Sequence, residues 1–386
     1  MIVTHLSLTD FRNYEALELD LRPGPNIFVG SNGQGKTNLV EALGFISTLG
    51  SHRVSVDHAL IRQDQQFAII RAQVAHAEAE LLAEVQINRT GANRAQVNRS
   101  AIKVRELPRY FSSVLFAPED LALIRGDPAG RRRFLDDLLV LRLPRLSGTF
   151  ADYDRVLRQR NSLLKTARGK PITSASPGTL GIWDDRLVVL GAEIIHARTS
   201  LTEELSPEVS RAYSAIVGAN HGVSIGNALS IFHAQVVQET AGDSVRSGVV
   251  PIEVAEGAFR EALARRRRAE LERGISLVGP HRDDIVFGLN GLEARGYASH
   301  GESWSFALAL KLAAAQILRR ESTRGDPVLI LDDVFAELDE ARRTRLAGAI
   351  ADYEQVLITA AVRDDVPSSI RGNVVGIQSG VVVENE

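Results

Sequence analysis

The chain has 386 residues, 44% of them hydrophobic and 24% charged, a balance typical of a globular protein with two or three domains. It contains no cysteine, which excludes disulfides and thiolate metal sites and fits a cytoplasmic location. The formal net charge of −3 means that a nucleic-acid partner needs a locally basic surface. We expect no membrane span and no signal peptide, because long uncharged apolar stretches and a basic start are missing.

The first thirty residues predict three strands. Apolar residues alternate from Ile2 to Leu8 and again from Leu17 to Leu21, as in half-buried strands. A turn at Pro23-Gly24-Pro25-Asn26 leads into Ile27-Phe28-Val29, an apolar run that suits a buried strand.

The segment from Gly30 to Thr37 has the spacing G-x-x-x-x-G-K-[ST] of a phosphate-binding loop. The strand at 27–29 precedes it and a helix-like run, 38–43, follows it, which is the context that the motif needs. A glycine-rich turn that binds nothing is the alternative, and the Lys-Thr pair and the flanking elements argue against it. We therefore expect an ATP site in which Lys36 reaches the β- and γ-phosphates, Thr37 ligates Mg²⁺, and the backbone surrounds the phosphates at Gly30, Ser31, Asn32, Gly33, Gln34 and Gly35.

The middle of the chain changes character. Apolar alternation at 81–87 predicts another strand, whereas helical spacing dominates from about residue 118 to 273. Two polar stretches, Arg168 to Gly181 and Thr240 to Gly248, are predicted to be loops. A basic helix from Ala255 to Arg273 closes the region, and Gly274 is placed to end it.

The last third predicts a return to mixed structure. Alternation at 285–289 followed by Asn290-Gly291 indicates a hairpin, and residues 303–320 have helical spacing. Apolar runs at 328–331 and 356–358 suit buried strands.

Asp332 and Asp333 follow the buried run at 328–331. The order suggests that Asp332 holds the metal and that Asp333 acts as the catalytic carboxylate that orients the attacking water, with Lys36 as the other catalytic group. A helix cap after a strand is the alternative for Asp332. Asp333 is one methylene shorter than the Glu of many split ATPases, so we expect slow hydrolysis.

Nearly 300 residues separate Thr37 from Asp332, and mostly helical sequence lies between them. The expected fold is therefore α/β: an ABC-type ATPase head with a phosphate-loop domain, split by a mainly helical insertion. The expected bounds are 1–118 for the first part of the head, 119–275 for the insertion and 276–386 for the second part.

Two segments of the second part predict a site shared by two protomers. Ser299 and Gly301 precede a helix, as in an ABC signature segment whose serine and helix N-terminus approach a γ-phosphate. Asp339 ends a segment placed like a D-loop. An ordinary capped helix is the alternative in both cases. A signature segment does not reach its own phosphate loop, so these residues would contact ATP in trans, in an ATP-dependent homodimer.

Residues 121–170 hold 12 Arg or Lys against 5 Asp or Glu, so this stretch is locally basic. Arg131, Arg132 and Arg133 are the candidate DNA-binding residues, because such a patch can neutralise phosphates without sequence readout. The alternative is a solvated helical face with internal ion pairs. Four further arginines, Arg265 to Arg268, point to different sides of one predicted helix. DNA contact and a solvated helical face are equally good interpretations there.

Three further segments carry a family resemblance. They are the runs L-T-D-F-R-N-Y at 8–14, P-E-D followed by L-I-R-G-D-P and R-R-R-F-L-D between 118 and 136, and G-P-H-R-D-D at 279–284. With both nucleotide motifs, the chain resembles the ABC-type DNA-repair ATPases related to SMC proteins from residue 1 to about 360. The resemblance implies roles for Arg12 and Asn13 in ATP binding.

The resemblance also implies a function: ATP-dependent binding to double-stranded DNA near single-strand gaps or junctions, weak DNA-dependent ATPase activity, and cooperation with RecR and RecO to load RecA. Thr359 stands where ABC transporters carry a switch histidine, and other members of the family tend to have threonine there. The signature segment keeps Ser299 and Gly301 but lacks three Gln or Arg donors of the usual family sequence.

Two other functions are alternatives to this one. Another SMC-like or overcoming-lysogenization-type ATPase would need a nuclease's acidic cluster or the apolar heptads of a coiled coil, and residues 119–275 are too interrupted for heptads. A small-molecule kinase would work within one subunit, so ATP-induced dimerisation separates it from the first interpretation.

Overall fold

The computed structural model describes residues 1–77, 79–168, 177–219, 221–232 and 245–383. The chain forms two compact units, each assembled from separate stretches of sequence. The first unit consists of Met1–Ile124, Glu208–Asn220 and Ser299–Glu386, and the second of Arg125–Pro207 and His221–Ala298. Among the described residues, no helix has the length and apolarity to cross a membrane.

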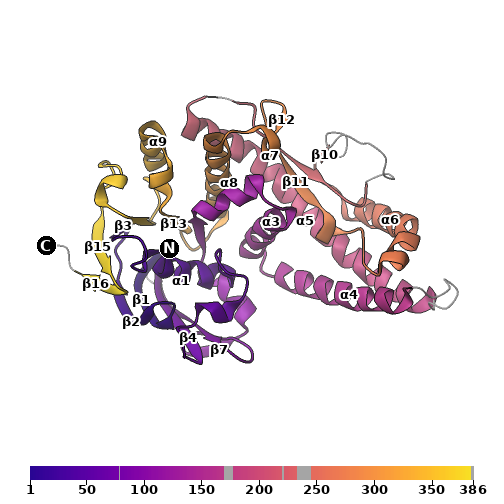
Figure 1. Ribbon diagram of the computed structural model, residues 1–386, viewed down its shortest axis with the longest axis horizontal. Helices are drawn as coiled ribbons and strands as arrows, with labels where there is room; N and C mark the ends of the chain where they lie inside the picture. Colours follow the sequence, from indigo (N-terminus) through magenta and orange to yellow (C-terminus); the bar gives the residue numbers. More distant parts are fainter. Residues whose placement is uncertain (78, 169–176, 220, 233–244, 384–386) are drawn as a thin grey trace. The chain divides into compact units, whose positions relative to one another are not determined.

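A six-stranded sheet carries the phosphate-loop strand of the first unit. Five neighbouring strands are parallel and β16 pairs antiparallel at one edge, in the order β16-β15-β3-β14-β13-β8. The strands are β3 (Gly24–Val29), β8 (Ser113–Phe116), β13 (Val328–Asp332), β14 (Gln355–Ala360), β15 (Asn373–Gln378) and β16 (Val381–Val383). In Figure 1 the indigo β3 and the yellow β15 lie together, although they come from opposite ends of the chain. Every residue of β13 and β14 is buried, as expected for central parallel strands.

A second, antiparallel sheet of the first unit has the order β2-β1-β4-β5-β6-β7. Its strands are β1 (Ile2–Phe11), β2 (Tyr14–Asp20), β4 (Phe67–His76), β5 (Ala79–Asn88), β6 (Arg94–Val97) and β7 (Ser100–Ile102). Leu6 and Leu8 face a core that also contains Phe28 and Phe45, so this sheet and α1 (Lys36–Thr48) share one hydrophobic core.

The other helices of the first unit pack around these sheets. They are α8 (His300–Glu321), α9 (Glu340–Ile350), the short α2 (Leu121–Arg125), and the 3-10 helices Asp57–Leu60, Val104–Arg109, Pro118–Asp120, Val334–Glu337 and Arg363–Asp365. Helix α1 packs on β8, β13 and β14, and α8 packs on β8. The amino end of α1 therefore lies at the carboxyl ends of the parallel strands, where α/β sheets bind ligands.

The second unit combines helices with a small antiparallel sheet. Its helices are α3 (Pro128–Arg142), α4 (Leu146–Ala167), most of α5 (Pro177–Val217), α6 (Ile252–Arg273), α7 (Ala294–Tyr297) and the 3-10 helix η5 (Pro280–Arg282). The sheet has the order β10-β9-β11-β12, formed by β9 (Ser224–Ala228), β10 (Val245–Arg246), β11 (Asp284–Leu289) and β12 (Leu292–Glu293). Tyr153, Ile195 and Phe259 belong to its hydrophobic core.

Most elements predicted from the sequence are confirmed. The strands at 2–8, 17–21, 27–29, 81–87, 285–289, 328–331 and 356–358 are present, and the helix predicted at 303–320 begins at His300. Helix α6 ends at Gly274, which has the left-handed φ of 71°. Asn290 and Gly291 both have positive φ, 52° and 78°, as the predicted tight hairpin turn requires.

The description of residues 118–273 as helical missed β9 and β10. Strand β9 has only five residues and gains its stability from pairing with β11, which no local pattern reveals. Of the loop predicted at 168–181, residues 169–176 lie outside the described residues, and 177–181 belong to α5. Of the loop predicted at 240–248, residues 240–244 lie outside the described residues, and β10 occupies Val245–Arg246.

The two compact units divide the chain near the expected first boundary, after Ile124 rather than after residue 118. Residues 276–298, expected in the head, group with the second unit, because β11 pairs with β9 there. Whether 1–118, 119–275 and 276–386 fold as separate domains stays a prediction.

A buried arginine holds the second unit together. The fully buried Arg160 donates to Asp184 at 2.7 Å, to Glu270 at 2.5 Å and to Ser276 at 2.6 Å, which joins α4, α5, α6 and the segment after α6. Glu270 is also fully buried. A buried charge is tolerated only when it is paired, so the three acidic and polar partners depend on the guanidinium.

We expect Arg160→Met to lower the free energy of unfolding by about 3–5 kcal/mol, because it leaves the Glu270 carboxylate buried without its cation. Arg155→Met is the matched control on the same helix, since Arg155 is 67% exposed and its pair with Asp152 contributes about 0–1 kcal/mol. Chemical denaturation followed by circular dichroism measures both. A loss for Arg160→Met no greater than that of the control would contradict the structural role.

Candidate nucleotide site

Three glycines shape the phosphate loop, because a side chain would be strained at Gly33 and would also meet close neighbours at Gly35 and Gly30. Gly33 and Gly35 have φ of 83° and 113°, and a Cβ on Gly35 would come within 2.7 Å of Asn13 and 2.9 Å of the Tyr14 hydroxyl. A Cβ on Gly30 would lie 2.2 Å from the carbonyl oxygen of Ile377. The loop therefore fits closely between neighbouring strands and keeps its curved shape.

Two other segments brace the loop from outside. The Tyr14 hydroxyl donates to the carbonyl of Gly35 at 3.1 Å, and the Gly380 N–H donates to the carbonyl of Gln34 at 2.9 Å. The Ser379 N–H donates to the Gln34 side chain at 2.5 Å. Since these contacts come from the β1–β2 and β15–β16 turns, the loop is held before any ligand arrives.

Lys36 begins α1 and is 3% exposed. Its Nζ donates to the carbonyl oxygens of Gly30 at 2.7 Å and Ser31 at 3.3 Å, so the ammonium lies over the loop itself. A phosphate placed in the loop would find this cation and the amino end of a 13-residue helix on the same side.

Thr37 and Asp332 meet across 295 residues of sequence. The Thr37 hydroxyl donates to Oδ1 of Asp332 at 3.0 Å, where the amino end of α1 reaches the carboxyl end of β13. A hydroxyl and a carboxylate are hard oxygen ligands, and Mg²⁺ usually takes one or two protein carboxylates with phosphate oxygens and water. These two side chains fit Mg²⁺. No cluster of three or more His, Cys, Asp or Glu that could hold a metal occurs in the described ranges.

Thr359, at the end of β14, connects both aspartates. Its buried hydroxyl donates to Oδ1 of Asp332 at 2.7 Å and accepts the backbone N–H of Asp333 at 2.9 Å. Asp333 has the left-handed φ of 51°, a conformation that costs a non-glycine residue of order 1 kcal/mol or more. The bond to Thr359 holds Asp333 in this conformation.

Burial raises the pKa of Asp332 to about 6, with the neighbouring Asp333 charge adding to the effect and the Thr359 hydrogen bond opposing it. A carboxyl whose pKa is higher in the folded chain binds its proton more tightly when folded. Asp332 therefore favours folding at low pH and costs stability once the pH rises through about 6. A cation beside the carboxylate removes this cost, so the site favours metal binding at neutral pH.

Arg12 and Asn13 lie behind the loop. Arg12 donates from Nε and Nη2 to the buried Glu41 of α1, at 2.9 and 2.8 Å. The Asn13 side chain accepts from Asn38 at 2.7 Å and donates to the carbonyl of Gln34 at 3.3 Å. In this structure both residues brace the loop and the first turns of α1, so their expected direct contact with ATP stays a prediction.

Ser299 is the N-cap of α8. Its hydroxyl oxygen accepts the Glu302 N–H at 3.3 Å, while Glu302 accepts the Ser299 N–H at 2.8 Å, so the two form a capping box. The cap uses the hydroxyl oxygen as acceptor and leaves the O–H able to donate to an incoming anion. Asp339 likewise caps α9 by accepting the Arg342 N–H at 2.8 Å. A Cβ on Gly301 would lie 3.0 Å from the Arg342 guanidinium, so these two helix ends are neighbours.

The three arginines expected to bind DNA have different surroundings in the second unit. Arg131 is 3% exposed and donates from Nε and Nη2 to Asp284 of β11, at 2.7 and 2.9 Å. In this structure the Arg131 guanidinium is engaged in a buried ion pair, and its expected DNA contact stays a prediction. Arg132 is half-buried and Arg133 is exposed, with a 3.6 Å contact to Asp137.

The structure adds residues that sequence reasoning missed. Tyr14, Ser379 and Gly380 brace the loop, and Thr359 organises the two aspartates. Lys311 of α8 bonds to Asp120 and to the carbonyl of Leu115, both at 2.8 Å, and so ties the signature helix to the end of β8. Tyr14 and Thr359 did carry a sequence signal, since Tyr14 ends the family run at 8–14 and Thr359 stands at the switch-histidine position, but neither signal indicated these contacts.

A family model described as "RecF/RecN/SMC N terminal domain" matches residues 2–380. The curated protein "DNA replication and repair protein RecF" of Clavibacter sepedonicus is 61% identical over 395 residues, covering 100% of this chain and 95% of that protein. A protein with the same description from Leifsonia xyli subsp. xyli is 61% identical and covers 100% of both chains.

A solved structure titled "Structure of the recombination mediator protein RecF-ATP in RecFOR pathway" superposes with a TM-score of 0.86 at 28% identity, covering 100% of this chain and 97% of that one. The match extends over both units and both halves of the candidate nucleotide site. The chain belongs to the RecF/RecN/SMC N terminal domain family and, within it, to the RecF proteins of DNA replication and repair, with the ABC-type ATPase fold of that family.

Proposed function

We propose that this protein is an ATP-controlled DNA-binding protein of recombinational repair that closes into a dimer with ATP and opens after slow hydrolysis. The observation that carries the proposal is the 3.0 Å bond between Thr37 and Asp332, which brings a phosphate loop and a metal-binding carboxylate together from opposite ends of the chain. The similarity to a RecF structure whose title names ATP supports the same ligand here.

In the proposed site, backbone N–H groups of residues 30–35 and the Lys36 ammonium bind the phosphates. Thr37 and Asp332 hold Mg²⁺, which neutralises phosphate charge when bound. Asp333 follows Asp332 at the carboxyl end of β13, held there by its bond to Thr359, and it would orient the attacking water. Its side chain is shorter than a Glu, and weak, DNA-stimulated hydrolysis is the consequence that we propose.

The second half of the proposed site comes from another copy of the chain. Ser299 presents a free O–H and the amino end of a 22-residue helix, and Asp339 caps the neighbouring α9. Ser299, Gly301 and Asp339 would then meet the ATP held by the partner's phosphate loop. ATP binding and dimerisation become one event, since neither protomer alone completes the site.

The proposed DNA partner is a duplex beside a single-strand gap or junction, bound through phosphate contacts of the second unit. Arg132 and Arg133 remain candidates for these contacts, because neither is buried in an ion pair like that of Arg131. The curated relatives are described as DNA replication and repair proteins, and the solved relative's title places it in the RecFOR pathway. We propose RecO and RecR as partners and the cytoplasm as the site of action.

Lys36→Ala tests ATP binding. We expect affinity for a fluorescent ATP analogue to fall at least tenfold, because a charge-assisted hydrogen bond contributes about 1.5–3 kcal/mol. Lys103→Ala, at an exposed lysine away from the loop, is the control and should leave the affinity unchanged. Unchanged affinity in Lys36→Ala, measured at equilibrium, would show that the loop does not bind ATP.

Thr359→Val keeps the shape of the side chain and removes its hydroxyl, so Asp333 loses the acceptor of its N–H and Asp332 loses a donor. We expect the stability to fall by about 1–3 kcal/mol and Mg²⁺-dependent ATP binding to weaken. Thr359→Ser keeps the hydroxyl and should behave like the wild type. Denaturation curves and magnesium titrations measure the two effects, and equal behaviour of the Val and Ser variants contradicts the role of the hydroxyl.

The dimer is tested by complementation. Ser299→Arg should leave ATP binding by the monomer nearly intact but block dimerisation and hydrolysis, because the large cation occupies the place of the partner's γ-phosphate. Mixing Ser299→Arg with Lys36→Ala should restore one complete site per heterodimer and therefore some hydrolysis. Light scattering with ATP and Mg²⁺ follows the dimer. Full ATPase activity of Ser299→Arg as a monomer would rule out the shared site.

A further inference from the structure

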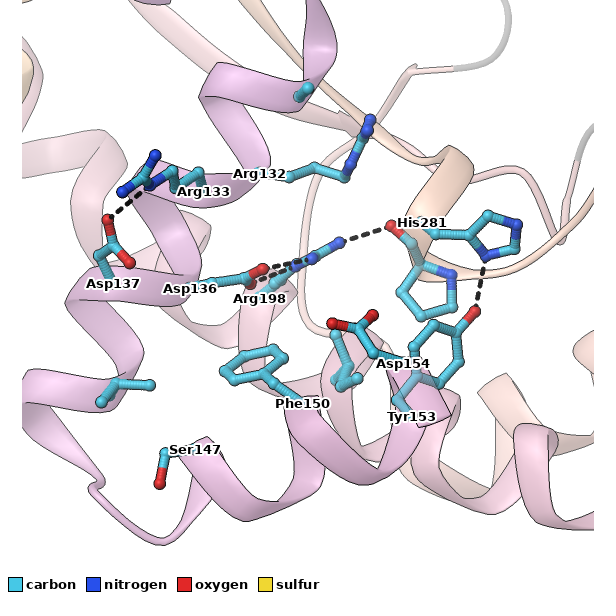
Figure 2. A pocket seen from close by; sticks show the side chains of 14 residues that line it. Arg132, Arg133, Asp136, Asp137, Ser147, Phe150, Tyr153, Asp154, Arg198 and His281 are labelled. Carbon is cyan, nitrogen blue, oxygen red and sulfur yellow. Dashed lines mark hydrogen bonds and ion pairs between the residues drawn. The ribbon is translucent and has the colours of Figure 1, made fainter. Parts of the chain in front are cut away.

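Two sequence motifs that the nucleotide site does not use meet in the second unit. Residues 129–137 of α3 and Pro280-His281 of η5 line one cavity of about 410 Å³, together with residues of α4 and α5 (Figure 2). This volume lies in the lower part of the range of small-molecule sites. The cavity is built from the family's arginine-rich and G-P-H-R-D-D segments, which are about 145 residues apart in the chain.

The walls of the cavity are fixed by hydrogen bonds between elements. Asp136 of α3 accepts two bonds from Arg198 of α5, both at 2.8 Å, and Arg198 also donates to the carbonyl of Pro280 at 2.7 Å. The hydroxyl of Tyr153 on α4 bonds to Nδ1 of His281 at 2.7 Å. These bonds join all four elements that line the cavity, so its shape does not depend on a ligand.

Two charged groups on the walls, Asp154 and Arg132, make no direct ion pair with a described residue, although opposite charges lie near each of them. Asp154 makes no hydrogen bond or ion pair with any described residue, and burial raises the pKa of its carboxyl. Arg132 donates Nη1 to the carbonyl of Asp283 at 2.7 Å but forms no ion pair, and burial lowers the pKa of its guanidinium. The cavity thus offers an acceptor at one place and a cation at another.

Phe150 lies between α3 and Asp154 in Figure 2, and both residues of α4 point into the cavity four positions apart. Val140 and Ile194 complete the apolar part of the lining. An aromatic face beside a carboxylate that accepts no hydrogen bond from a described residue matches a flat ring that carries N–H groups.

The combination of groups excludes simpler ligands. An anion alone would meet Asp136, Asp137 and Asp154, and a lysine or arginine side chain alone would meet Arg132 and Arg133. A nucleotide matches wall groups of both charges. Its ring would pack on Phe150, its amino group would donate to Asp154, and its phosphate would face Arg132 and Arg133.

We infer that this cavity binds one unpaired nucleotide with an amino-bearing base, in preference to thymine. A paired base has its Watson–Crick edge occupied and its ring stacked, so an intact duplex cannot supply the ligand. Bases in a single-strand gap can. The ligand could be a base in a DNA strand or a free nucleotide, because the two have the same chemistry. The inference rests on the proposed DNA binding only in the first case.

The test uses the full chain with its phosphate loop filled by a non-hydrolysable ATP analogue. Gapped duplexes carry 2-aminopurine at one unpaired position, and intact duplexes of equal length serve as reference. We expect 2-aminopurine fluorescence to be quenched on binding, because the base stacks on Phe150. Phe150→Leu and Asp154→Asn should each weaken binding to gapped DNA about five- to tenfold and leave duplex binding within twofold.

Asp152→Asn is the matched control, since Asp152 lies on the same helix, pairs with Arg155 and does not line the cavity. Charge alone predicts that removing either carboxylate tightens binding to all DNA. Weaker gapped binding in Asp154→Asn but not in Asp152→Asn therefore supports the cavity. Equal tightening in both variants overturns it. Both aspartates are solvent-accessible, and thermal melting checks that the variants fold.

Competition identifies the source. If excess dGMP restores the 2-aminopurine fluorescence, the cavity is assigned to free nucleotides. If the fluorescence stays quenched, the cavity is assigned to the DNA strand. Displacement of the oligonucleotide by a basic peptide but not by dGMP, with Phe150→Leu without effect, would overturn the inference and indicate a protein partner. Duplex binding by the wild type distinguishes a failure of the cavity proposal from a failure of the proposed function. If the wild type binds duplex DNA, only the cavity proposal fails. If it does not, the proposed DNA-binding function fails.

Discussion

The hydrogen bond from Thr37 to Asp332 is the contact on which the first unit depends. It forms only if β3 and β13 are parallel members of one sheet, with β14 between them, so that α1 begins where β13 ends. The sheet order thereby turns two remote sequence segments into one site. Thr359 lies on the intervening strand and bonds to both aspartates, so β13, β14 and the amino end of α1 each contribute a polar group at the carboxyl edge of the sheet.

The second unit is organised by ion pairs instead. Arg131, Arg160 and Arg198 each bind a carboxylate from another element, and all three are buried. A buried pair contributes less to stability than apolar packing does, but breaking it is costly. These arginines therefore fix how α3, α4, α5 and α6 meet, and the basic composition of residues 121–170 describes the interior as much as the surface.

Sequence reasoning could propose the residues of the candidate nucleotide site because its chemistry is local. The glycines, Lys36 and Thr37 have a fixed spacing, and an apolar run before Asp332 is enough to place it at a strand end. It could not foresee that Arg131 pairs with Asp284, since the partner is 153 residues away and the three arginines look alike in sequence. Strand β9 was missed for the same reason, because its pairing partner, β11, follows more than fifty residues later.

The same limit explains why the bracing residues were missed. Tyr14 ends the family run at 8–14 and Gly380 belongs to no motif, and neither position indicates that the two residues hold the phosphate loop by bonds to the carbonyls of Gly35 and Gln34. Such bonds use carbonyl groups and leave the loop's N–H groups available to a phosphate. A loop held in this way pays little conformational entropy when the anion binds. Binding energy then remains for the step that we propose, the joining of two protomers around the nucleotide.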